Sequence, residues 1–475
     1  MEHLSTRKRI QAIENKDKRD LVEKCLSPVV FDSVKLERMI KTFEDEIKLA
    51  NSTDENLRKK TDLFWENTYV RRLLDGTENG TYLGLDLGGT NFRVVRVDMN
   101  NGKATTQTKY YNLEKRLLTG PSSVMFDYIA KCLSEFLSKG SYSQEEPLPL
   151  GFTFSFPSQQ KSLKHSTIST WTKSITCTDG PGLDSVVLLE EAIQRLGGLP
   201  VPVDVVARIS DTTGTLLAGN LADEKCRIGL IIGTGSNAAF VEYTRNIEKW
   251  DTCYKDDDPS DIVAINCEFG AFGDNGCLNF LKTEFDHELD KHSNHPYSYT
   301  FEKLYAGHYL GELVRLTLAK LTGAGVLYGG KGSAKLMTRW NFTTSHVTAI
   351  ESDTDADATN TVSVLKEMDL LDLATDEDIS LTREVCELVS KRGAYIVATA
   401  MVVLLNHINL PEVTIAIDGS LYERHPKYHQ HMMEVVRKWR PQTQTTLKLI
   451  KDGSGQGGAL VAAIARKRSR VPEEN

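Results

Sequence analysis

Hydrophobic positions along this chain follow two different periods, and the change falls near residue 80. Before it, Leu36, Met39, Phe43 and Ile47 recur with the spacing of one helical face, which predicts an amphipathic helix. After it, short apolar runs end in glycine-containing turns, a pattern that is typical of strands. We predict strands at residues 82–87, 92–97, 150–156, 203–209, 227–232, 238–243 and 413–417.

Helical periodicity fills much of the remaining chain. We predict helices at residues 122–137, 185–196, 301–321, 383–408, 426–439 and 459–466, and another that begins after Asp211. The hairpins at 82–97 and 227–243 resemble one another, because each joins two strands through a glycine turn that carries threonine and asparagine. This weak internal repeat favours two similar α/β lobes that face each other across a cleft.

Composition narrows the class of protein. Of the 475 residues, 40% are hydrophobic and 26% are charged, and the net charge of −8 gives no basis for a nucleic-acid groove. The basic clusters at residues 7–9 and 466–468 are interpreted as solvated termini. Eight scattered cysteines without a CxxC pair favour free thiols and a cytoplasmic location. We expect no membrane span, since no apolar run is long enough.

Three glycine-rich segments, at residues 88–90, 233–235 and 453–458, each join or follow a predicted strand. Phosphoryl transfer requires backbone N–H groups around the phosphates, Mg²⁺ and a base that orients the attacking hydroxyl. Glycine suits the first role, because it lets the backbone approach a ligand closely. Asp86 precedes the first turn, where a carboxylate can either close the turn or hold Mg²⁺ through water.

Longer motifs carry a resemblance to a known family. Residues 85–93 (LDLGGTNFR) and 233–237 (GTGSN) resemble the two phosphate-binding motifs of the hexokinase family. Residues 151–157 (GFTFSFP), followed by 171–173 (WTK), are similar to its sugar-binding signature. Further matches, in the family's order, lie at 266–273 and 301–304 for the sugar and at 418–422 and 453–457 for adenosine.

The resemblance implies an α/β, two-domain actin-like sugar-kinase fold (ribonuclease H-like), with a cleft between a small and a large domain. The small domain would hold residues 80–210, with the terminal helix 456–475 packed on it. The large domain would hold residues 1–79 and 211–455. The two domains would close over the sugar and exclude water.

The resemblance also assigns roles to residues. Asp211 would be the general base and Lys173 a second catalytic residue, and both would contact the sugar. The other expected sugar ligands are Ser155, Thr172, Ser210, Asn237, Glu268 and Glu302. The expected nucleotide-binding residues are Asp86 (through Mg²⁺ and water), Gly88, Gly89, Thr90, Asn91, Arg93, Gly233, Thr234, Gly235, Thr344, Thr348, Asp418, Gly419, Ser420, Gly453, Ser454 and Gly455.

The implied activity is phosphorylation of the 6-hydroxyl of glucose, fructose or mannose, with ATP and Mg²⁺ as cofactors, by an enzyme that we expect to be a monomer. Ser210 stands where the family usually has asparagine, and the shorter side chain predicts a raised KM for glucose. Residues 65–68 (WENT) replace a Met-Leu-Pro-Thr stretch. A sugar sensor with little turnover and an actin-like ATPase are the alternatives, although the ATPase would have no use for the sugar motifs.

Overall fold

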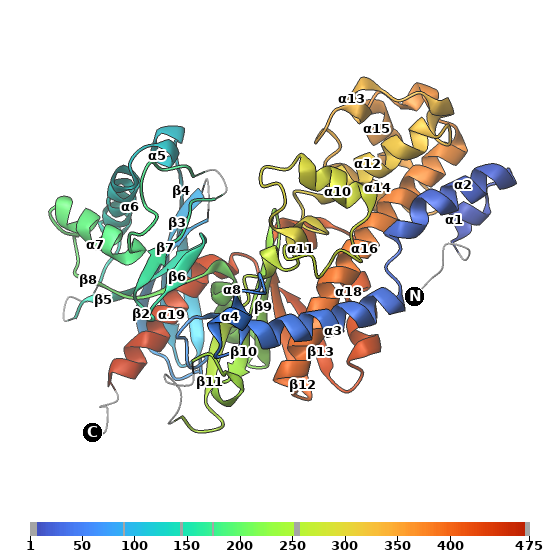
Figure 1. Cartoon of the computed structure of the whole chain (residues 1–475). Helices are drawn as coiled ribbons and strands as arrows, with labels where there is room; N and C mark the ends of the chain where they lie inside the picture. Colours follow the sequence, from blue (N-terminus) through green and yellow to red (C-terminus); the bar gives the residue numbers. More distant parts are fainter. Residues whose placement is uncertain (1–6, 89–90, 143–145, 173–174, 251–256, 471–475) are drawn as a thin grey trace.

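The computed structural model describes residues 7–88, 91–142, 146–172, 175–250 and 257–470. Its elements gather around two β-sheets (Figure 1). The smaller sheet has five strands in the order β4-β3-β2-β5-β8. These strands are β2 (Gly80–Leu87), β3 (Asn91–Asn100), β4 (Lys103–Asn112), β5 (Leu148–Phe154) and β8 (Val203–Ile209). β2, β5 and β8 are parallel, so their carboxyl ends meet at one edge of the sheet.

The second sheet has six strands in the order β1-β11-β10-β9-β12-β13. They are β1 (Glu66–Asn67), β9 (Cys226–Ile232), β10 (Ser236–Tyr243), β11 (Ile262–Asn266), β12 (Glu412–Asp418) and β13 (Gln444–Leu449). A separate hairpin, β6 (Ser158–Gln160) with β7 (Ser166–Ile168), follows β5. Every predicted strand is present within a few residues of its predicted limits.

Helices cover both sheets. They are α1 (Lys8–Gln11), α2 (Lys16–Leu26), α3 (Ser33–Ala50), α4 (Glu55–Arg58), α5 (Lys115–Thr119), α6 (Ser122–Leu137), α7 (Ser185–Arg195), α8 (Asp211–Ala222), α10 (Glu284–Lys291), α11 (Thr300–Lys303), α12 (Leu310–Gly323), α13 (Ala334–Met337), α14 (Thr344–Glu351), α15 (Thr359–Glu367), α16 (Asp376–Ile408), α17 (Ser420–Arg424), α18 (Tyr428–Trp439) and α19 (Gly453–Arg470). Short 3-10 turns are η2 (Ser27–Val29), η3 (Thr244–Asn246), η4 (Phe269–Ala271), η5 (Tyr328–Gly330) and η6 (Leu371–Leu373).

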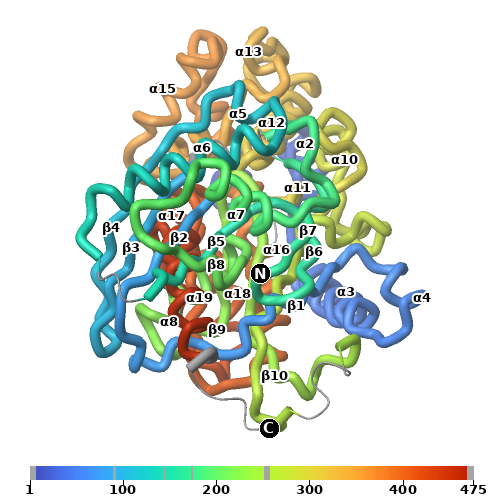
Figure 2. Tube along the Cα trace, turned by 90° about the vertical axis from the view of Figure 1, so that its left-hand side faces the viewer, coloured from blue at the N-terminus to red at the C-terminus, as the bar shows by residue number. Residues whose placement is uncertain are grey.

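Two helices lie between the sheets. α19 packs on β2, β5 and β8 of the smaller sheet, α8 packs on β9 and β12 of the larger one, and the two helices contact each other (Figure 2). An apolar cluster that includes Val97, Ile209, Leu217 and Leu460 continues from one sheet to the other through these helices. The start of α8, which follows the end of β8, therefore lies between the two sheets.

The start of α19 corrects one prediction. Residues 453–458 were expected to form a glycine turn before a helix at 459, but the helix itself begins at Gly453. Its glycines let it approach the neighbouring backbone closely, since a Cβ on Gly457 would lie 2.1 Å from the Cα of Gly214. On the facing strand, a Cβ on Gly151 would lie 2.0 Å from the carbonyl oxygen of Gly458. Close packing, rather than a turn, accounts for these glycines.

The predicted helix at 301–321 is also wrong, because it is divided into α11 and α12. Between them, the N–H of Gly307 donates to the carbonyl of Gly233 at 2.8 Å, and the N–H of His308 donates to that of Thr234 at 3.1 Å. The helix is interrupted here because these N–H groups bond to the second glycine turn instead. Glycine at position 307 permits this close approach, since a Cβ there would lie 2.6 Å from the Gly233 oxygen.

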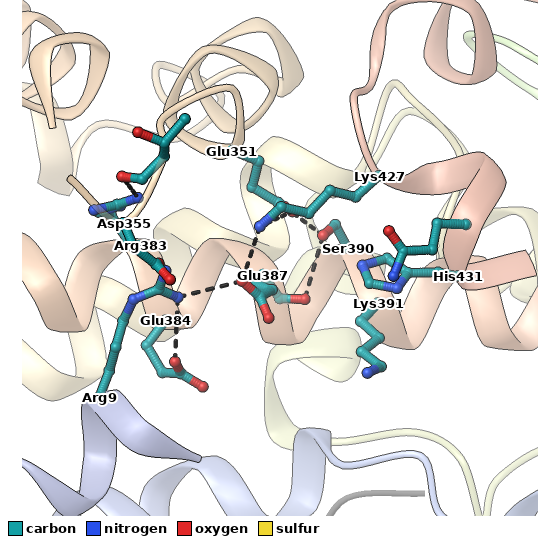
Figure 3. A network of polar contacts seen from close by, with 12 residues as sticks. Arg9, Glu351, Asp355, Arg383, Glu384, Glu387, Ser390, Lys391, Lys427 and His431 are labelled. Atoms are coloured by element: carbon teal, nitrogen blue, oxygen red, sulfur yellow. Dashed lines mark hydrogen bonds and ion pairs between the residues drawn. The ribbon is translucent and has the colours of Figure 1, made fainter. Parts of the chain in front are cut away.

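α16 is the long core helix of the larger group of elements. In length and composition it would suit a membrane, but 94% of its most apolar window is buried inside the protein. Charged residues from several elements meet at this helix and form what we call the α16 cluster. Glu384 and Glu387 lie on α16, Glu351 lies on α14, and Arg7 and Lys427 directly precede α1 and α18. Figure 3 shows Glu351, Glu384, Glu387 and Lys427. Arg7 is 7% exposed and is paired with Glu384 and Glu387, so the interpretation of residues 7–9 as a solvated terminus is wrong for Arg7.

Candidate active site

Asp211 lies where β8 ends and α8 begins. Ser210 is the N-cap of α8, and its hydroxyl accepts a hydrogen bond from the N–H of Thr213 at 3.4 Å. The same hydroxyl lies 3.0 Å from the hydroxyls of Thr212 and Thr213. Asp211 is the first helical residue, and its Oδ1 accepts a hydrogen bond from the N–H of Thr212 at 2.8 Å. The Ser210 hydroxyl is thus engaged by its own helix.

A hydrogen-bonded group of polar side chains from the larger sheet adjoins this helix start. We call Thr212, Asn237, Asn266 and Glu268 the sugar cluster, after the two predicted sugar ligands Asn237 and Glu268 that it contains. The Asn237 amide donates to Glu268 Oε1 at 2.8 Å and to Asn266 Oδ1 at 2.9 Å, and the Asn266 amide donates to Glu268 Oε1 at 2.7 Å. The Thr212 hydroxyl donates to Asn266 Oδ1 at 3.2 Å. These contacts join the residue after Asp211 to two predicted sugar ligands.

Asn266 itself was not predicted as a site residue. It opens the segment 266–273 that resembles a sugar-contacting motif, and this was the signal that could have found it. Glu268 has a φ of 46°, in the left-handed region that few non-glycine residues occupy. Such conformations concentrate at functional sites, because the surrounding structure must impose them. The two amides that hold the Glu268 carboxylate supply part of that constraint.

Glu302, on α11, supports the second glycine turn. Its Oε2 accepts a hydrogen bond from the N–H of Ser236 at 3.0 Å. A Cβ at Gly235 would lie 2.5 Å from the same oxygen, so only glycine fits there without a shift of the carboxylate. Gly419, at a φ of 123°, approaches the turn from β12, and a Cβ there would lie 2.4 Å from the carbonyl oxygen of Ile232. The predicted sugar and phosphate segments therefore contact one another.

Strands β2 and β3 are joined to the start of α19 by Arg93. Its guanidinium donates to Asp86 Oδ2 at 2.7 Å, to Asp452 Oδ1 at 2.6 Å and to the Ser454 hydroxyl at 2.5 Å. Asp418 accepts hydrogen bonds from the N–H groups of Gly419 and Gly453. Burial raises the pKa of Asp418 to about 6. Asp452, which was not predicted, thus joins two sets of predicted nucleotide residues: Asp86, Arg93 and Ser454 on one side, and Asp418, Gly419 and Gly453 on the other.

The fit of this group to Mg²⁺ rests on Asp86. Its Oδ1 is buried and has no hydrogen-bond partner among the described residues, so it can accept from a metal-bound water. In the described part of the chain, no set of three or more His, Cys, Asp or Glu side chains is arranged to hold a metal. The residues fit an ion that arrives with a nucleotide and is bound through water.

Other predicted residues have varied positions. The N–H of Ser155 donates to the carbonyl of Leu87 at 3.2 Å, which places the loop after β5 beside the end of β2. The Thr344 hydroxyl donates to the carbonyl of Gly307 at 2.6 Å. Gly88 directly follows β2, Thr172 ends the described segment 146–172, Thr348 lies on α14, and Ser420 begins α17. Gly89, Thr90, Lys173 and the side chain of Asn91 lie outside the described residues.

The fold matches solved hexokinases. The hexokinase of Schistosoma mansoni, solved in complex with glucose, aligns with a TM-score of 0.81 and 34% sequence identity over 94% of this chain and 99% of that one. A second solved hexokinase gives a TM-score of 0.80 at 26% identity, over 95% of this chain and 100% of that one. The protein therefore has the two-domain α/β sugar-kinase fold.

Sequence comparison assigns the family. Two family models, both described as Hexokinase, match residues 21–221 and 227–464. Rat and human hexokinase-2 are each 40% identical over 407 residues, which is 84% of this chain and 43% of the relative. The chain belongs to the hexokinase family, and it spans less than half the length of these curated relatives.

Proposed function

We propose that this chain transfers the γ-phosphoryl group of ATP to the 6-hydroxyl of glucose or a related hexose such as fructose or mannose. The observation that carries the proposal is the hydrogen-bonded connection from the start of α8, where Asp211 lies, to Asn237 and Glu268. A related hexokinase has been solved with glucose, which supports a hexose as the acceptor. The connected group around Arg93 and Asp418 would bind the nucleotide.

In the proposed reaction, Asp211 accepts the proton of the attacking hydroxyl as the bond to phosphorus forms. Glu268 and Asn237 bind hydroxyls of the sugar ring, and the Asn266 amide keeps the Glu268 carboxylate in place. Lys173 would add positive charge near the reacting oxygens. Mg²⁺ bound with ATP supplies charge neutralisation at the phosphates, and Asp86 would hold it through water.

Ser210 sets the expected affinity. Its hydroxyl caps α8 and lies against Thr212 and Thr213, so it has little capacity left for a sugar hydroxyl. A missing hydrogen bond of this kind weakens binding by about 1–3 kcal/mol. We infer a raised KM for glucose rather than loss of activity.

The alternative is a sugar-binding protein with little turnover. Coupled-assay turnover on a panel of hexoses with Mg·ATP, alongside calorimetric binding of the same sugars, separates the two. The proposal predicts turnover on at least one hexose at a rate that saturates with sugar. Sugar binding without turnover on any member of the panel would favour the sensor, and turnover of ATP that is independent of sugar would favour an ATPase.

A further inference from the structure

One charged side chain next to the site has no part in the proposed chemistry. Arg208 lies on β8, three residues before Asp211, and is 4% exposed. A buried arginine is costly unless its donors are satisfied and its charge is balanced. No carboxylate of the described residues lies at ion-pair distance from Arg208. Its direct partners are therefore neutral groups.

The guanidinium instead holds the loop that follows β5. Nη2 donates to the carbonyl oxygens of Phe154 at 3.0 Å and Phe156 at 3.2 Å, which flank Ser155 on both sides. Nη2 also donates to the Ser158 hydroxyl at 2.9 Å, and Nη1 donates to Gln160 Oε1 at 3.0 Å. The guanidinium carbon lies 5.4 Å from the centre of the Phe154 ring. One side chain therefore fixes both neighbours of a predicted sugar ligand.

The charge of Arg208 is balanced at longer range by acids of the site. Burial lowers the pKa of Arg208 to about 10, against the opposing effect of Glu66, Glu268 and Asp211. Glu66 lies on β1 opposite Asn266 of β11, and its Oε2 is 3.5 Å from the Asn266 amide nitrogen. The arginine is thus placed between the sugar-binding loop and the acids that the proposed mechanism uses.

We propose that Arg208 is a positioning residue of the sugar site, which sets the loop around Ser155 against the strand that leads to Asp211. The proposal rests on the proposed function for the ligand, but the contacts that carry it are independent of any ligand. Its loss would remove the guanidinium donor from the two carbonyls that flank the predicted sugar ligand Ser155. Sugar binding would then weaken while nucleotide binding would not.

The test compares Arg208→Met with Arg208→Lys and with a matched control. Arg392 is also 4% exposed and buried, but it pairs with Asp286 on α10 in the larger group of elements. Arg208→Met is expected to raise KM and the calorimetric Kd for the hexose about tenfold or more, with KM for ATP within about twofold. Arg208→Lys keeps a charge and one donor, so it should recover part of the loss. Arg392→Met should lower thermal stability without moving the sugar constants.

Amide exchange supplies a readout that needs no substrate. In Arg208→Met, a peptide covering residues 154–160 should exchange faster than in the wild type, and in Arg392→Met it should not. Unchanged exchange in this peptide would overturn the proposal even if the wild type phosphorylates no hexose. Faster exchange with an unchanged sugar Kd, or equal losses from Arg208→Met and Arg392→Met, would show a structural role only and would also overturn it.

Discussion

Two groups of buried charge in this protein are built in different ways. In the α16 cluster, cations and carboxylates are direct partners, since Arg7 pairs with Glu387 at 2.9 Å. Lys427 pairs with the same carboxylate at 2.9 Å (Figure 3). Burial alone would raise the pKa of Glu387, but the hydrogen bonds from Arg7 and Lys427 outweigh it and hold the pKa well below its usual range. This cluster ties α1 to α16 and to the start of α18.

In the sugar cluster, neutral groups hold the charged ones. Glu268 accepts hydrogen bonds from the amides of Asn237 and Asn266, and nearby Arg208 donates to carbonyls. Burial, with the nearby Glu268 charge, raises the pKa of Glu66 to about 8. The contrast teaches that paired charges join helices, whereas charges held by amides and carbonyls are available to a polar ligand. The predictions below test that division.

The largest effect is expected when the α16 cluster loses a partner. Arg7→Met removes the closer of the two arginines that pair with Glu384, which is 2% exposed, and leaves only Arg9 at 3.5 Å. We expect it to lower the free energy of unfolding by about 3 kcal/mol. Lys8→Met, on the same helix but exposed, is the control and should change it by less than about 0.5 kcal/mol. Urea unfolding measures both. A changed KM for hexose in the folded Arg7 variant would contradict the view that the α16 cluster serves stability and the sugar cluster serves ligand binding.

The next effect lies at the second glycine turn. Gly235→Ala brings a Cβ to 2.5 Å from Glu302 Oε2 and must displace that carboxylate. We expect a loss of about 2 kcal/mol in hexose binding, or roughly a 30-fold rise in KM. Gly323→Ala, at the end of α12 with no atom within 4 Å of its Cβ, is the matched control and should leave KM unchanged. Steady-state kinetics measure both KM values. An unaltered KM for hexose in Gly235→Ala would contradict the prediction that Glu302 binds the sugar.

A smaller effect is expected at the helix cap. Ser210→Asn keeps a capping side chain and adds reach, so KM for glucose should fall about tenfold, which corresponds to ~1.4 kcal/mol. Ser210→Ala removes the cap and should cost about 1 kcal/mol of stability without lowering KM. Initial rates over a range of glucose concentrations measure this. If Ser210→Asn has the same KM for glucose as the wild type, then Ser210 is not the cause of a raised KM.

The smallest expected effect is on the pH dependence of the free energy of unfolding. The pKa of Glu66 is raised by folding, so the native state binds more protons than the unfolded state between about 4.5 and about 8. Stability therefore falls as pH rises through this window. Asp418, raised to about 6, adds a slope of the same sign at the acid end. Glu66→Gln should flatten the dependence of stability on pH between about pH 6 and about pH 8. Thermal unfolding in buffers across this pH range measures it, and a slope identical to that of the wild type would contradict the raised pKa of Glu66.

Much of the framework could be predicted from the sequence. β8 has its predicted limits, and α8 begins at Asp211, because a β-branched run and a capping serine mark these boundaries locally. β4 (KATTQTKYYN) was missed, since it is mostly exposed and lacks an apolar face. The glycines of α19 and the interruption at Gly307 were misread, because their cause is a neighbouring backbone that lies far away in the sequence.

The chemistry of the site was predicted unevenly for a similar reason. Asp211, Asn237 and Glu268 lie within motifs whose spacing is local, so the resemblance could locate them. Two of the residues around them are close in sequence, since Asn266 precedes Glu268 by two positions and Arg208 precedes Asp211 by three. Glu66, by contrast, comes from β1 and lies 200 positions from Asn266. A sequence does not reveal which of its arginines and glutamates are buried next to one another, and only the packing of the two sheets shows it.

The central claim is that Asp211 accepts the proton of the hexose 6-hydroxyl. The most direct measurement is kcat of Asp211→Ala and Asp211→Asn with Mg·ATP, beside the calorimetric Kd for the same hexose. The account predicts that kcat falls by about 10²–10⁴-fold in both variants while the hexose still binds. Turnover within about tenfold of the wild type, by a folded variant that binds the sugar, would contradict it.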